Sequence, residues 1–129
     1  MGTAFFGYET ALEYWRAVGA GITSWHGQTD LCRVSDECNR GNEILAAFPQ
    51  LGIADRAPLH VLVSEKNRAH SCSGITYHVC GQPLPEGSFS RITDHAVISS
   101  PALCLLQAAQ LTKPNRCLPL LELCMEFLG

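Results

Sequence analysis

Apolar residues recur at helical spacing in three stretches of the chain. The first stretch predicts an amphipathic helix of about three turns, formed by Tyr8, Ala11, Leu12, Trp15 and Val18. Similar stripes predict helices over residues 101–111, with Ser100 as N-cap and Pro101 in the first turn, and over residues 118–128. A further helix is expected over residues 36–48, because Ser35 can cap it and Pro49 would end it.

The middle of the chain changes to a two-residue period, which is typical of half-buried strands. Residues 59–63 and 75–79 alternate apolar and polar side chains, and the polar segment between them favours an antiparallel hairpin with a long loop. Residues 88–93 and 96–99 predict two more short strands around a turn at Asp94 and His95. The expected fold is α+β, with a small, mainly antiparallel sheet packed against amphipathic helices.

The size and charge of the chain limit what it can do alone. Its 129 residues suit one domain spanning 1–129, and 47% hydrophobic residues are enough for one core. The formal net charge is -3 and the basic residues are scattered, so we expect weak or no direct binding of nucleic acid. The most apolar charge-free region, 95–112, is interrupted by serines, a proline and glutamines, so no membrane partner is expected.

Cysteine usage indicates the compartment. Seven cysteines are an odd number for a disulfide framework, and Cys104, Cys117 and Cys124 lie in apolar, helix-like stretches where thiols behave as small hydrophobic groups. Residues 1–6 show no charged region followed by a sustained apolar segment, as a secretory signal would. We therefore expect a soluble, reduced, cytoplasmic protein.

Four segments, in their order and at their distances, carry a resemblance to a known family. The segments are Thr10–Arg16 (TALEYWR), Pro58–Val63 (PLHVLV), Gly74–His78 (GITYH) and Val97–Ala109 (VISSPALCLLQAA). Together they resemble the middle module of AbiEi-like antitoxin and regulator proteins of type IV toxin-antitoxin systems, which also occurs ahead of very-short-patch-repair-like endonuclease domains. The resemblance spans residues 8–128.

The resemblance implies a bacterial regulatory module that recognises other macromolecules. In such families a winged-helix DNA-binding domain usually precedes the module, and in many relatives a nuclease domain follows it; we expect this chain to lack both. Many relatives continue the serine-proline helix start with an Arg-Thr pair, where this sequence has Leu103 and Cys104. A contact that such an arginine makes would be missing here.

Candidate metal ligands are His70, Cys72, His78 and Cys80, which form two His-x-Cys pairs at strand spacing. Structural zinc sites usually place paired ligands two to four residues apart, so free thiols and surface histidines are the competing interpretation. We expect no metal and no other cofactor. A Cys/His nucleophile pair is also disfavoured, because no cysteine follows a glycine-rich turn at a helix start.

The expected function is that of a non-catalytic recognition or regulatory module, because the sequence contains no complete catalytic constellation. Its partner would be a protein or a second copy of the chain. Candidate interface residues are Trp15 and Arg16, of types that dominate interface energetics, and His60 and His78, which would face each other across neighbouring strands. The competing interpretation of Trp15 is a core residue, which its place on the apolar stripe of its helix favours. Two alternatives stay open: the regulatory front part or remnant of a restriction-endonuclease-like enzyme, and a self-associating structural protein.

Overall fold

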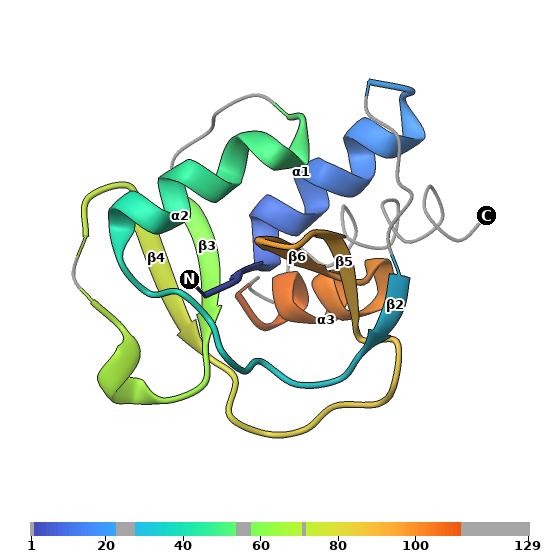
Figure 1. The fold of residues 1–129 in the computed structure, drawn as a ribbon. Coiled ribbons are helices and arrows are strands. Elements are labelled where there is room, and N and C mark those ends of the chain that lie inside the picture. Colours follow the sequence, from blue (N-terminus) through green and yellow to red (C-terminus); the bar gives the residue numbers. More distant parts are fainter. Residues whose placement is uncertain (1, 23–27, 54–57, 71, 112–129) are drawn as a thin grey trace.

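The structure is a computed structural model that describes residues 2–22, 28–53, 58–70 and 72–111 (Figure 1). It confirms the α+β class, with three α-helices and a mixed β-sheet in the described part of the chain. The α-helices are α1 (Tyr8–Gly19), α2 (Gly41–Ala47) and α3 (Pro101–Leu111), and the 3-10 helices are η1 (Phe48–Leu51) and η2 (Lys66–Arg68). The strands are β1 (Ala4–Phe6), β2 (Gln28–Leu31), β3 (Leu59–Val63), β4 (Ile75–Val79), β5 (Phe89–Thr93) and β6 (Ala96–Ser99).

The strands form one sheet in the order β2-β5-β6-β1-β3-β4, so β2 and β4 lie at opposite sides of the molecule (Figure 1). Three neighbouring pairs are antiparallel, namely β2 with β5, β5 with β6, and β1 with β3. The pairs β1 with β6 and β3 with β4 are parallel. The short strand β1 therefore joins two groups of strands at the centre of the sheet.

The prediction of an antiparallel hairpin for residues 59–63 and 75–79 is wrong, because β3 and β4 are parallel over their whole length. The connection leaves β3 through η2, and the Asn39 side chain holds the Arg68 carbonyl at 3.0 Å. It then turns at Cys72, whose carbonyl oxygen accepts the Ile75 N–H, so that β4 starts beside the start of β3. A side-chain alternation of two is the same for both strand directions, so the sequence pattern carried no information on this point.

The helix predicted over residues 36–48 starts later, at Gly41. Asp36 has a left-handed φ of 52°, and Glu37 forms an isolated parallel bridge with Thr3. The acidic pair therefore lies in extended and turn conformation ahead of α2 and does not occupy its first turn. The α-helix ends at Ala47, and Pro49 lies in the following 3-10 helix, as a residue without an N–H allows.

Both faces of the sheet carry a hydrophobic core. On one face, alternate strand residues such as Phe6, Val61 and Ile98 pack with the buried sides of α1, α2 and α3. On the other face, a smaller core consists of Phe5, Val34, Leu62, Phe89 and Val97, with Tyr8, Leu31, Cys80, Leu84 and Leu103 packed against it. None of the five residues at the centre of this second core lies in an α-helix.

The helix at Pro101 is confirmed, and the Ser100 hydroxyl accepts the Leu103 N–H at 3.3 Å, as the predicted N-cap should. The helix predicted over residues 118–128 lies outside the described residues. Among the helices that the structure describes, none is both long enough and apolar enough to span a membrane.

Candidate functional site

His60 on β3 and His78 on β4 form a direct imidazole pair, called the histidine pair below. The His60 Nδ1 and His78 Nε2 atoms are 2.9 Å apart, and the two rings are nearly parallel at 19°. Because β3 and β4 run in the same direction with His60 opposite Thr76 and His78 opposite Leu62, the two histidines are diagonal neighbours on one face. The prediction that these residues face each other is confirmed, although His60 is only 7% exposed and the pair is partly buried.

Tyr8 completes the cluster from the first position of α1. Its ring stacks on His78 with the ring centres 3.6 Å apart and the planes at 15°, and it lies farther from His60, at 6.1 Å. The backbone N–H of Tyr8 donates to Gln107 Oε1 of α3 at 2.9 Å, and Gly7 donates to the His60 carbonyl at 3.0 Å. Four elements, β3, β4, α1 and α3, therefore meet at the histidine pair.

Burial sets the protonation of this cluster. Loss of solvation lowers the pKa of His60, with the Glu9 carboxylate acting in the opposite direction. Loss of solvation and the neighbouring His60 lower the pKa of His78 to about 4. Burial raises the pKa of the Tyr8 phenol and of the Cys80 thiol. At neutral pH the cluster consequently holds neutral rings, a phenol and a thiol.

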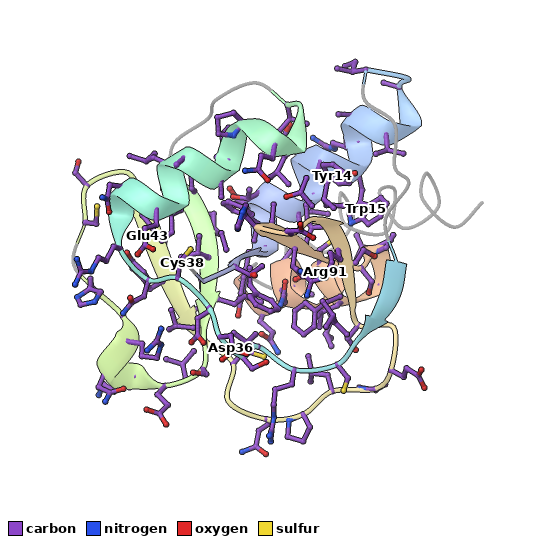
Figure 2. All side chains as sticks on the ribbon, in the orientation of Figure 1. Tyr14, Trp15, Asp36, Cys38, Glu43 and Arg91 are labelled. Carbon is purple, nitrogen blue, oxygen red and sulfur yellow. The ribbon has the colours of Figure 1, made fainter. Side chains whose placement is uncertain are left out.

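A second candidate site is a polar hollow of about 550 Å³ at the carboxyl ends of β3 and β4, called the polar crevice below. In sheets with parallel strands, ligands commonly bind outside these ends. Its lining residues are Arg33, Val34, Ser35, Asp36, Glu37, Ser64, Glu65, Arg68 and Gly81. Figure 2 labels Asp36 on the segment that leads to α2, two residues before Cys38.

An ion pair between Glu37 and Arg68 forms part of the polar crevice. The Glu37 carboxylate is buried, accepts the Ser64 N–H and accepts Arg68 Nε at 3.1 Å, while Arg68 Nη2 donates to the Glu37 carbonyl oxygen at 2.5 Å. Burial works against ionisation of Glu37, but the hydrogen bonds from Ser64 and the Arg68 charge outweigh it and lower the pKa of the carboxyl. These two charges are therefore already compensated within the crevice.

The two other predicted interface residues lie apart from both sites. Trp15 is 7% exposed, and its indole Nε1–H donates to the Ser99 carbonyl at 2.8 Å, so Trp15 belongs to the core that joins α1 to β6. Arg16 is exposed next to it on α1 and pairs with Glu13 at 3.7 Å. Of Trp15 and Arg16, the two interface residues predicted on α1, Arg16 is the one with an exposed side chain.

The four candidate zinc ligands separate into two places. His70 Nε2 lies 2.9 Å from Asn39 Nδ2, and its ring meets Tyr77 edge-on. His78 is bound in the histidine pair, with Cys80 two residues further along the same face. Within residues 2–22, 28–53, 58–70 and 72–111, no three His, Cys, Asp or Glu side chains are arranged to hold a metal ion.

Two of the thiols that the structure describes, those of Cys38 and Cys80, have raised pKa values, which opposes their action as nucleophiles. Cys38 is buried, and burial together with Glu43 and Glu37 raises its pKa to about 11. Free thiols, and no disulfides, are present at Cys32, Cys38, Cys72 and Cys80. A reactive thiol needs a lowered pKa, so this environment opposes thiol chemistry at Cys38.

Comparisons with known proteins give no match: no family model, no curated protein and no solved structure matches this chain.

Tyr8, Glu37 and Arg68 are site residues that the sequence did not predict. Tyr8 was assigned to the apolar stripe of a helix, and nothing local connects Glu37 with Arg68, 31 positions further along. Their roles arise from tertiary contacts alone.

Proposed function

We propose that this chain is a non-catalytic recognition or regulatory module that binds a protein partner, in the manner of the middle module of AbiEi-like antitoxins. The observation that carries the proposal is the polar crevice at the carboxyl ends of β3 and β4. Ser64 and Gly81 lie just past the ends of the paired strands β3 and β4, and residues 33–37, ahead of α2, supply much of the remaining lining. The family itself rests on the four sequence segments described above.

The chemistry of the polar crevice favours binding over catalysis. Glu37 and Arg68 satisfy each other and are held by the Ser64 N–H, so neither is poised to exchange a proton with a bound molecule near neutral pH. Exposed groups of both signs, Arg33, Asp36 and Glu65, surround them. A mixed-charge hollow of this kind suits a polar segment of another protein, because paired rim charges give orientation and specificity.

The first experiment identifies the partner by affinity capture from a lysate of the source organism at several salt concentrations. The identified partner is then purified and titrated against the wild-type chain and against Arg33→Ala. We expect Arg33→Ala to weaken binding at least fivefold, which corresponds to about 1 kcal/mol. Arg40→Ala is the matched control, because Arg40 is also exposed and does not line the crevice.

Arg16→Ala distinguishes the two candidate surfaces with the same change of charge. A loss of binding in Arg16→Ala, with Arg33→Ala unaffected, would move the interface to α1 and reject the crevice. Recovery of the bait alone at every salt concentration would contradict the recognition module. The two alternatives have their own signatures: a neighbouring reading frame with nuclease carboxylates would favour the enzyme remnant, and a concentration-dependent mass in sedimentation would favour self-association.

A further inference from the structure

Tyr8 adopts a backbone conformation that a bulky residue rarely takes. Its φ is 53°, in the left-handed region, and the structure describes one other non-glycine residue there, Asp36. Such a conformation persists only where surrounding contacts enforce it, and it often marks a functional element. Tyr8 is also the first residue of α1, so its conformation sets where that helix begins.

Three groups of contacts enforce the conformation of Tyr8. Gln107 Oε1 accepts the Tyr8 N–H, and the His60 carbonyl oxygen accepts the N–H of the preceding residue, Gly7. In the same turn of α1, Thr10 Oγ1 accepts the His60 N–H at 2.8 Å. The third contact is the stack of the Tyr8 ring on His78, whose own position depends on the hydrogen bond to His60. The first turn of α1 is thus held on the histidine pair.

The bond between His60 and His78 tolerates only a limited number of protons. One ring nitrogen must donate and the other must accept, which is possible when both rings are neutral or when the pair carries one extra proton. With two extra protons both nitrogens carry hydrogen, and two positive rings face each other across 2.9 Å. The hydrogen bond is then lost and replaced by repulsion.

The surroundings provide little compensation for a second charge. From α1, Glu9 is exposed and favours protonation of His60, and the Tyr8 phenol stays neutral. From the β4 side, the Cys80 thiol is also neutral, since burial raises its pKa. Gln107 of α3 is uncharged. Among the described residues, Glu9 is the anionic group that acts on the pair, and it lies on the turn that would be released.

We propose that the histidine pair is an acid-sensitive latch: it holds Tyr8 and the first turn of α1 against β3 and β4 until a second proton enters, and then releases them. Release would relieve the left-handed backbone of Tyr8 and uncover the second core beneath its ring, where Leu62 and Cys80 lie. The latch is independent of the partner proposed above, because it concerns the chain alone.

The test is an NMR titration of the full chain from pH 7 to pH 3, past the His78 pKa of about 4, following the ring nitrogens of both histidines and the ring protons of Tyr8. We expect the Tyr8 signals to leave their stacked positions as the second proton binds, while Phe89 signals keep native values. His78→Gln retains a hydrogen-bonding side chain that cannot be protonated, so its Tyr8 signals should stay constant over this range. His95→Gln is the matched control and should behave like the wild type.

The wild-type titration decides the matter even if His78→Gln does not fold. Tyr8 signals that remain stacked while both rings carry protons would overturn the latch. Simultaneous loss of the Tyr8 and Phe89 signals would also overturn it, since that outcome is global unfolding. Movement of the Tyr8 signals in a folded His78→Gln variant, at the pH where they move in the wild type, would also overturn the latch.

Discussion

The Trp15 indole and the Ser99 carbonyl are joined by a hydrogen bond of 2.8 Å that ties α1 to the end of β6. Ser99 is fully buried and is followed at once by the N-cap of α3, so the bond fixes α1 beside the start of the helix that it packs against. A buried carbonyl that loses its donor cannot turn to water.

We expect Trp15→Phe to lower the free energy of unfolding by about 1–3 kcal/mol, because it leaves the Ser99 carbonyl unsatisfied and a gap beside it. Urea denaturation followed by circular dichroism measures the loss. Arg16→Ala, one position along and exposed, should change stability by no more than about 0.5 kcal/mol. Equal stability of Trp15→Phe and the wild type would show that the indole N–H contributes nothing.

The Glu37–Arg68 ion pair predicts a second stability effect. Glu37→Gln removes the negative charge beside Arg68 and should cost about 1–3 kcal/mol at pH 7, less than a fully buried pair because the Arg68 side chain is 38% exposed. Since the folded-state pKa of Glu37 is lowered, its contribution is present above the ordinary value of 4.5 and is lost as the pH falls through the folded value. The variant should therefore show a shallower loss of stability below pH 4.5, and an unchanged acid profile would contradict this assignment.

The histidine pair predicts pH-dependent stability in a higher range. A His78 pKa lowered from 6.5 to about 4 means that, between these values, the unfolded chain binds more protons than the folded chain. Stability should be full above pH 6.5 and should fall as the pH decreases toward 4. Equilibrium unfolding at half-unit pH steps should give a smaller slope in His78→Gln than in the wild type, while His95→Gln follows the wild type. Parallel slopes for all three proteins would count against a neutral, buried His78.

A close backbone approach at Gly81 gives a test of the polar crevice. A Cβ at this position would meet the Ser64 carbonyl oxygen at 2.7 Å, where backbone has to move. We expect Gly81→Ala to destabilise the protein by about 1–3 kcal/mol and to disturb the crevice. Gly19→Ala is the control, because nothing lies within 4 Å of its added methyl group at the end of α1, and it should be neutral or slightly stabilising. Thermal unfolding of both variants provides the comparison.

Much of the fold could be predicted because its longer elements repeat apolar residues at one clear period. This applies to α1, to α3 with its Ser100 cap, and to the strands β3, β4 and β5. The strand β6 shows no alternation and was predicted as a short apolar run after the turn at Asp94 and His95. The strand β1 was missed because Ala4–Phe6 is a three-residue run buried on both sides, which shows no alternation. The strand β2 was missed because Gln28–Leu31 is short and polar, with an irregular register against β5.

The candidate site was predictable only in part, for a similar physical reason. His60 and His78 face each other in either strand direction, since alternation alone puts them on one face. Two features could not be predicted, namely the stack of Tyr8 on His78 and the polar crevice. They depend on the parallel connection of β3 to β4 and on the extended path of Asp36 and Glu37, which arise from contacts far apart in sequence. The acidic residues were assigned to a helix start because the burial of Glu37 against Arg68 has no local signature.

The position of β1 at the centre of the sheet has a consequence for how the chain is made. Ala4–Phe6 leaves the ribosome before both of its partners, and one of them, β6, is synthesised only after most of the described chain. A short apolar segment must therefore wait unpaired, first for β3 and then for β6. Translation speed and chaperone access during that interval should govern the yield of native protein more strongly than the stability of any single helix.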